Sequence, residues 1–423
     1  MNALIAPHIA AVGAFVAVVA LWAGAPGCDV EAVQLPARED ADAIAVAEVS
    51  ADGSGTDSAA SPPEAQEGPP VAGERALTHG SDGDDLFPSL DGDELVWVRI
   101  RVDATLLASG QEAPDCLSCP YCTGCVADIR HRRLPDGEEE TLSTTYGVRA
   151  APRIGDGHIV WFDQNGYIQL YDLATRRTAS VPETTYGNRT PIPFGGALWW
   201  YGYDYSSWGS WGLMAYDLSA GERSTELVTP MDDGWWGSGG LNGMGVGQPF
   251  ALGTKRVVWS RWEAADAQAE EWTFVVHAWP YYGTEAPAVP LDPERDHIHP
   301  MLTASDTLVT ENYLHGAGCT VGNCDLALTA YPANGAPREL APGAKPSLLI
   351  DPVVAGDRIV WLDHRDGLYH LWAVDVARPA EGARRMTSDK AKVGTLSTFA
   401  AGTRGLVWAD RRTGRWRLYS RDW

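Results

Sequence analysis

Four cysteines stand at strict three-residue intervals in the segment CLSCPYCTGC: Cys116, Cys119, Cys122 and Cys125. Thiols at this spacing can form disulfides, act as a redox-active dithiol, bind zinc or hold an iron–sulfur cluster. Two more, Cys319 and Cys324, lie in the segment GCTVGNCD, and Cys28 lies near the N-terminus. The compartment of the protein and the elements that carry the thiols decide between these chemistries.

The N-terminal sequence indicates export. An apolar run from Ile9 to Trp22 is followed by small residues and Cys28 in the sequence LWAGAPGC. This pattern resembles a bacterial lipoprotein signal, with departures at Ala25 and Pro26 and no basic residue before the apolar run. The resemblance implies a signal peptide over residues 1–27 and a lipid on Cys28. A signal cleaved elsewhere and an uncleaved anchor are the alternatives, and each of them exports the rest of the chain.

Residues 28–72 differ in composition from the rest of the chain. They are rich in Ala, Asp, Glu, Ser and Pro and almost lack aromatic and basic residues. Such a segment cannot bury a core, so we expect a disordered acidic tether behind the lipid anchor. The formal net charge of the whole chain is −24. This charge argues against nucleic acid and anionic lipid as partners, because both are polyanions.

Internal repeats in residues 73–423 indicate the fold. GDGHIVWFDQNGYIQLYDLATRRT from Gly155 and GDRIVWLDHRDGLYHLWAVDVAR from Gly356 share a Gly-Asp turn, an apolar pair, Trp, Asp and an alternating run. GTRGLVWADRRTGRWRLYSRDW from Gly402 is a third copy. Four weaker copies have their Trp position at Trp97, Trp200, Trp259 and Thr310. In most units a proline stands nine or ten residues before the Trp position: Pro88, Pro152, Pro191, Pro249, Pro300 and Pro352.

Each unit is predicted to consist of strands. Its apolar periodicity is two, and turn residues interrupt it every eight to twelve positions. In the unit from Gly356 we expect four strands, at residues 351–354, 358–363, 369–375 and 383–387. Seven such units predict an all-β, seven-bladed β-propeller over residues 73–423. The template resembles the TolB-like and WD-like propeller repeats of exported bacterial proteins, which implies the fold and no particular function.

The two ends of the repeat region are predicted to meet in one blade. The last unit ends at Trp423 after its third strand, whereas GERALTH from Gly73 matches fourth-strand segments such as GARRMTS from Gly382. Residues 74–79 are therefore expected to complete the last blade as an N-terminal strand and to remove its exposed edge.

The long connections of the units are predicted to gather on one face. In a four-stranded antiparallel blade, the loop between strands two and three and the loop to the next blade share a face, which we name the long-loop face. The other connections are tight turns on the opposite, short-turn face. Two long loops of the third unit hold aromatic residues among Gly and Ser: Tyr201, Tyr203, Tyr205, Trp208, Trp211, Trp235 and Trp236. Such side chains suit proteins or sugar rings as ligands, and they also suit packing within the loops themselves.

The cysteines are best interpreted as disulfides. With Cys28 lipidated, six remain, an even number in an oxidising compartment. Cys319 and Cys324 would close a hairpin tip, and in the four-cysteine cluster nested pairing, first with last and second with third, suits a hairpin best among three connectivities. The centre CPYC is identical to the glutaredoxin dithiol, but a strand hairpin lacks the helix N-terminus of that site. Zinc and iron–sulfur sites use other ligand spacings.

Few other sites suggest themselves. His297 and His299 in DHIHP, together with His315 and His364, are expected on the long-loop face, as solvated loop residues or, less readily, as metal ligands. No Gly-x-Ser-x-Gly, His-Glu-x-x-His or phosphate-loop motif occurs, and we expect no cofactor.

The sequence therefore predicts an exported propeller held at the membrane only by its lipid, in the periplasm or at the cell surface. We expect a monomer without enzymatic activity that binds or assembles with an envelope or surface protein. A glycan-binding propeller that uses the aromatic loops is the first alternative. A hydrolase or lyase with its site at the mouth of the central channel is the second.

Overall fold

The computed structural model describes residues 73–79, 82–108, 116–117, 124–146, 151–182, 189–204, 210–230, 250–264, 272–280, 289, 291–314, 327–333, 335–341, 350–363, 369–393 and 398–423. The predicted signal peptide, Cys28 and the tether lie outside these residues. None of the helices in these ranges has the length and apolar character needed to cross a membrane.

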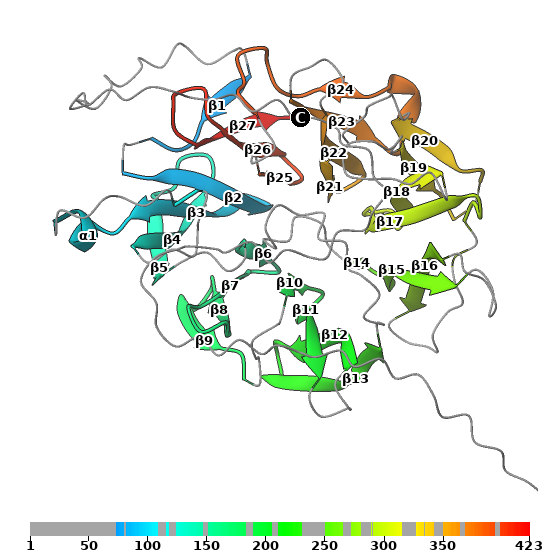
Figure 1. The fold of residues 1–423 in the computed structure, drawn as a ribbon, viewed down its shortest axis with the longest axis horizontal. Helices are drawn as coiled ribbons and strands as arrows, with labels where there is room; N and C mark the ends of the chain where they lie inside the picture. The colour runs from blue at the N-terminus through cyan, green and yellow to red at the C-terminus, as the bar shows by residue number, and fades with distance from the viewer. Residues whose placement is uncertain are drawn as a thin grey trace, which may run out of the picture. The chain divides into compact units, whose positions relative to one another are not determined.

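Seven antiparallel sheets follow one another along the chain and form the blades of a β-propeller (Figure 1). Blade one contains β2 (Asp84–Asp91), β3 (Glu94–Val102), β4 (Cys125–Arg133) and β5 (Glu140–Tyr146). Blade two contains β6 (Arg153–Gly155), β7 (His158–Phe162), β8 (Ile168–Asp172) and β9 (Arg177–Ser180). Blade three contains β10 (Arg189–Phe194), β11 (Ala197–Asp204), β12 (Ser210–Asp217) and β13 (Glu222–Pro230).

The remaining blades follow the same order. Blade four contains β14 (Phe250–Leu252), β15 (Arg256–Ala264) and β16 (Trp272–Pro280). Blade five contains β17 (Arg295–Leu302), β18 (Leu308–Leu314), β19 (Ala327–Tyr331) and β20 (Arg338–Ala341). Blade six contains β21 (Ile350–Ala355), β22 (Arg358–Asp363), β23 (His370–Asp375) and β24 (Arg384–Arg385). Blade seven contains β25 (Phe399–Ala401), β26 (Gly405–Asp410), β27 (Arg417–Asp422) and β1 (Glu74–Ala76).

Within the described residues, short helices lie in two connections: α1 (Ala104–Ala108) after β3 and a 3-10 helix (Pro379–Glu381) after β23. Blade four shows three strands within the described residues. The position of its fourth strand is marked by Val289, whose N–H donates to the carbonyl of Val276 in β16 at 2.9 Å. The predicted all-β, seven-bladed propeller is thus confirmed, and the four strands expected in the unit from Gly356 correspond to β21 to β24.

The Trp position of the template is a core position between blades. It lies in the second strand of six blades, where the residue is at most 3% exposed: Trp97, Trp161, Trp200, Trp259, Trp361 and Trp408. Trp361 of blade six, for example, belongs to one buried cluster with Val309 of blade five. Removing a buried Trp side chain costs about 3–5 kcal/mol, so this repeated contact strongly stabilises the packing of neighbouring blades.

The prolines of the template lie at bulges in the first strands. The register of the first strand shifts around four of them: Pro88, Pro191, Pro300 and Pro352. Because proline has no N–H to donate, the ladder is interrupted there and the strand continues on both sides. The residue before the proline has a φ of 56° at Phe87 and of 44° at His299.

The N-terminal strand closes the ring. β1 pairs with β27 in antiparallel register, Glu74 with Arg421, Arg75 with Ser420 and Ala76 with Tyr419. Beyond β1, the N–H of Leu77 donates to the carbonyl of Leu418 at 2.8 Å. The predicted completion of the last blade by residues 74–79 is therefore confirmed.

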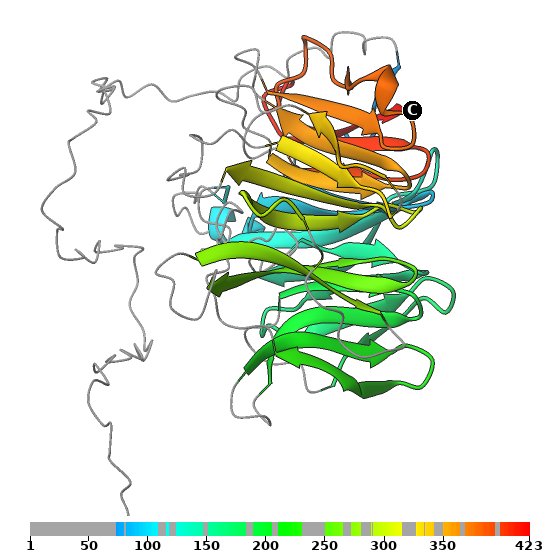
Figure 2. The same ribbon diagram turned by 90° about the vertical axis from the view of Figure 1, so that its right-hand side faces the viewer.

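The two faces of the propeller differ as the repeats predicted. Connections between first and second strands are tight, such as residues 92–93, 156–157 and 356–357. The strand ends that meet the long-loop face are further apart in the sequence, such as Val102 and Cys125, Pro230 and Phe250, and Leu314 and Ala327. Figure 2 shows the strands of the blades running between these two faces.

Candidate functional site

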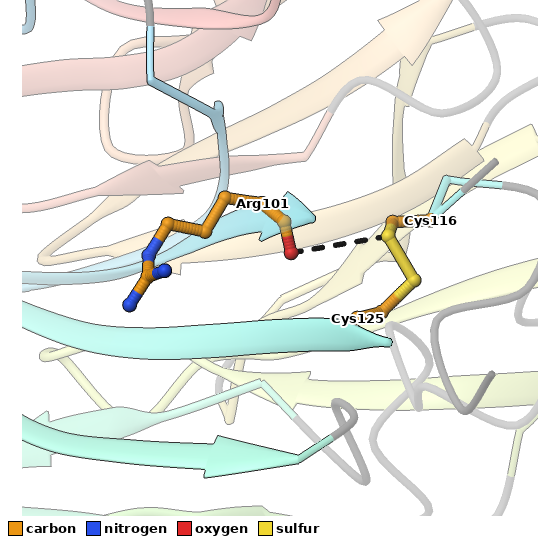
Figure 3. The surroundings of a disulfide bond; sticks show 3 residues. All are labelled: Arg101, Cys116 and Cys125. Atoms are coloured by element: carbon orange, nitrogen blue, oxygen red, sulfur yellow. Dashed lines mark hydrogen bonds between the residues drawn. A yellow bond between two sulfur atoms is a disulfide. The ribbon is translucent and has the colours of Figure 1, made fainter. Parts of the chain in front are cut away.

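A disulfide ties down the long connection of blade one. Cys116 and Cys125 are joined at a Cα–Cα distance of 5.5 Å and are 7% and 1% exposed (Figure 3). Cys125 begins β4 opposite Val102 of β3, and Cys116 Sγ lies 3.9 Å from the carbonyl oxygen of Arg101. The disulfide therefore fixes Cys116, which lies within the connection, to the first residue of β4.

This pairing is the outer bond of the predicted nested arrangement. Cys119 and Cys122, which would form the inner bond, lie outside the described residues, as do Cys319 and Cys324. A backbone bond adds to the closure, because the N–H of Asp103 donates to the carbonyl of Gly124 at 2.7 Å.

Two tyrosines project from the long-loop face beside this closure. Tyr146 is 64% exposed and Tyr167 is 48% exposed. Among the large hydrophobic residues that the structure describes, these two are the exposed ones. Tyr146 ends β5 opposite Val126, which follows Cys125 in β4. Tyr167 lies in the hairpin between β7 and β8 of the neighbouring blade.

The hairpin that carries Tyr167 is held by one carboxylate. Asp163 Oδ1 accepts the N–H of Asn165 at 2.8 Å and that of Tyr167 at 3.0 Å. The N–H of Asp163 donates to the carbonyl of Tyr167 at 2.9 Å. Sequence reasoning missed both tyrosines as candidate contact residues. The signal for Tyr167 was its place at the tip of a short Asp-x-x-Gly hairpin, where a side chain has little to pack against.

The aromatic residues predicted as ligand contacts fall partly within the described backbone. Tyr201 and Tyr203 belong to β11, and Tyr203 stands directly opposite Trp211 of β12. The backbone thus brings these three positions to the long-loop end of blade three. Tyr205, Trp208, Trp235 and Trp236 lie outside the described residues.

The interpretation of His297 as a solvated loop residue is wrong. Both His297 and His299 belong to β17, the first strand of blade five, and His297 is 3% exposed. Its Nε2 donates to the carbonyl of Asp292 and its Nδ1 accepts from Thr310 Oγ1, each at 3.1 Å. With both ring nitrogens in hydrogen bonds, His297 is a core residue and not a metal ligand.

Comparison with blade one gives a reason for a histidine at position 297. Trp97 Nε1 donates to Asp85 Oδ1 at 3.0 Å, and Asp85 precedes the bulge proline by three residues, as His297 does. Thr310 fills the Trp position of blade five. A His–Thr pair therefore replaces an Asp–Trp pair at the same two positions. Thr310 is a smaller donor than Trp97, and His297 is a larger acceptor than Asp85.

His297 makes stability depend on pH. Burial lowers the pKa of His297, although the Asp292 carbonyl and the charges of Asp292 and Asp296 act in the opposite direction. The unfolded chain binds the proton near pH 6.5, and the folded chain resists it. The contribution of His297 is therefore complete above pH 6.5 and is lost as pH falls toward its lower folded pKa.

We expect a His297→Gln variant to lose less stability than the parent between pH 7 and pH 5. The difference in slope of the unfolding free energy is at most about 1.4 kcal/mol per pH unit for one proton. Urea unfolding at a series of pH values measures it. Equal slopes in the two proteins would mean that His297 binds its proton equally well in the folded and the unfolded chain.

No group of three or more His, Cys, Asp or Glu side chains within the described ranges could hold a metal ion. His315 and His364 lie outside those ranges.

No family model matches the chain, and no curated protein is similar to it in sequence. Solved structures do resemble it. The β-propeller domain of the Trilobed protease from Pyrococcus furiosus, which has an open velcro topology, matches with a TM-score of 0.57 and 11% identity over 82% of this chain and 95% of that chain. An acylaminoacyl peptidase from Pyrococcus horikoshii matches with a TM-score of 0.54 and 12% identity over 81% of this chain.

The chain spans 51% of the acylaminoacyl peptidase, about half its length. At 11% and 12% identity these similarities establish the propeller fold alone. They give no support to the sequence-based expectation that the chain is not an enzyme.

Proposed function

We propose that this protein is an exported, lipid-anchored binding module that holds another protein of the bacterial cell envelope against its long-loop face. The exposure of Tyr146 and Tyr167 carries the proposal. Both lie on the same face of neighbouring blades. Tyrosine offers a large contact area and a polar hydroxyl while losing few rotatable bonds on binding, and it is enriched at interfaces for that reason.

The disulfide between Cys116 and Cys125 supports the same surface. A covalent constraint that is already present before binding reduces the entropy lost when a partner docks, which increases affinity. The net charge of −24 favours a partner with a basic surface, because opposite charges accelerate encounter.

The proposal is tested by replacing both exposed tyrosines. We expect a Tyr146→Ser/Tyr167→Ser variant to recover its crosslinked partner from an envelope extract at least about tenfold less well, as loss of central aromatic contacts does at other interfaces. The matched control is Arg177→Ser, which changes an exposed residue at the start of β9 on the short-turn face. Thermal unfolding of all three proteins should be alike.

Recovery of the same partner by the double variant would contradict the proposal. Loss of binding to a glycan array, without any crosslinked protein, would instead identify the surface as a sugar site. The anchor is tested separately, since Cys28→Ser should move the protein from the membrane fraction to the soluble fraction.

A further inference from the structure

Blade five departs from the repeat template at a position that is uncharged in every other blade. Glu311 directly follows the Trp position, where the other blades have Val98, Phe162, Tyr201, Ser260, Leu362 and Ala409. Beside it, His299 precedes the bulge proline, where blade one has Phe87. The repeats thus provide an internal comparison: the propeller fold requires neither a carboxylate nor an imidazole at these positions.

The two side chains are paired. Glu311 is 2% exposed, and its Oε2 accepts a hydrogen bond from Nδ1 of His299. The second carboxylate oxygen of Glu311, Oε1, is buried and has no hydrogen-bond partner in the described structure. The side chain of His299 is 28% exposed, so the pair is reachable from solvent on the imidazole side.

A buried carboxylate with an unpartnered oxygen is unfavourable for folding. Burial of an ion costs several kcal/mol unless hydrogen bonds compensate, and half of this carboxylate lacks them. Leu362 occupies the same position in blade six at 1% exposure, which shows that an apolar side chain fits this site of the template. A charged group retained where the fold favours an apolar one marks a candidate binding site.

The location of the pair suits a ligand. β17 is the first strand of its sheet, and the first strands lie nearest the propeller axis (Figure 1). Glu311 shares a face of β18 with Val309, which packs on blade six.

We propose that His299 and Glu311 form a binding site for a primary ammonium group of a ligand that enters along the propeller axis. Oε1 of Glu311 accepts an ammonium N–H, and the hydrogen bond from His299 holds the carboxylate in position. An ammonium ion supplies both the missing donor and a compensating charge. A metal ion is a poorer occupant, because the described residues provide no cluster of three ligating side chains.

The test uses n-butylammonium as the probe and isothermal titration calorimetry as the measurement. We expect saturable binding to the parent and a loss of about tenfold or more in Glu311→Gln, the size typical of a hydrogen bond to a charged group. n-Butanol and tetramethylammonium should not bind, since one lacks the charge and the other lacks the N–H donor.

A second variant, Glu311→Leu, separates binding from folding. It installs the residue of blade six, so we expect a higher midpoint of thermal unfolding together with loss of n-butylammonium binding. A lower midpoint would show that the carboxylate is a structural component and would overturn the proposal. Equal n-butylammonium affinity in the parent and in Glu311→Gln would overturn it as well. Neither outcome bears on Tyr146 and Tyr167, which lie in other blades.

Discussion

A chain that begins at residue 80 should be far less stable than one from which residues 29–70 have been deleted. The first deletion removes β1, its ladder on β27 and the buried side chain of Leu77, which is 3% exposed. Loss of a buried Leu side chain alone costs about 2–5 kcal/mol, a large part of the total stability of a typical domain. Urea unfolding followed by tryptophan fluorescence measures both. A midpoint shared by the two chains would mean that β1 contributes nothing to the closed ring.

The side chain of Glu74 accounts for much of this effect. It is fully buried, accepts the N–H of Ser388 at 2.8 Å and pairs with Arg412 at 2.7 Å. Arg412 also donates to Asp410. Burial lowers the pKa of Arg412, and the hydrogen bonds and charges of Asp410 and Glu74 more than offset this and raise it. Glu74 therefore joins the N-terminal strand to two segments near the C-terminus.

Glu74→Ala should lower the unfolding free energy by about 3–5 kcal/mol, because it leaves Arg412, whose side chain is only 13% exposed, with one partner fewer. The matched control is Glu381→Ala, in which the removed carboxylate pairs with Arg378 on the surface and is 59% exposed. Surface pairs contribute at most about 1 kcal/mol. If the two variants lost equal stability, burial of the pair would not be the cause.

Asp85→Ala should have an effect of similar size at the contact between blades one and seven. Asp85 has no exposed surface and accepts hydrogen bonds from Trp97 Nε1 at 3.0 Å and from Arg99 Nε at 2.8 Å. The guanidinium of Arg417 in β27 forms a longer ion pair with Asp85, at 3.7 Å. Burial lowers the pKa of Arg99, and the hydrogen bond and charge of Asp85 more than offset this and raise it.

Removing this carboxylate leaves the buried guanidinium of Arg99 and the indole N–H of Trp97 short of an acceptor. It also removes the negative charge nearest to the buried guanidinium of Arg417. We expect a loss of about 3–5 kcal/mol in unfolding free energy, measured by urea titration. Asp136→Ala is the control, because Asp136 is 80% exposed and pairs with Arg75 on the surface. A loss below about 1 kcal/mol in Asp85→Ala would mean that the arginines regain their partners by rearrangement.

The fold could be predicted from the sequence because the same pattern of a turn, an apolar pair and a Trp position recurs in seven units. The expected strand 358–363 agrees with β22, and the expected closure at residues 74–79 agrees with β1. The ion pairs of Glu74 could not be predicted, because Arg412 lies 338 residues away and only the closed ring brings the two together.

The error at His297 has a physical cause. A proline suggests the beginning of a strand, and that interpretation leaves His297, three residues before Pro300, in the preceding loop. The strands in fact continue through a bulge, so that β17 begins at Arg295 and Pro300 lies inside it. For the candidate sites, the sequence indicated the long-loop face and one possible disulfide arrangement. The exposure of Tyr146 and the unpartnered oxygen of Glu311 depend on packing that no local pattern encodes.

The closure by β1 also sets how the propeller responds to mechanical force. Tension applied to the residues before Gly73 enters the folded structure at Glu74, the first residue of β1. The ion pair with Arg412 and the bonds to Ser388 are then among the first contacts to carry the load. Detachment of β1 would expose the edge of β27 while blades one to six keep their own hydrogen bonds. Blade seven is therefore the part of the ring expected to yield first under tension.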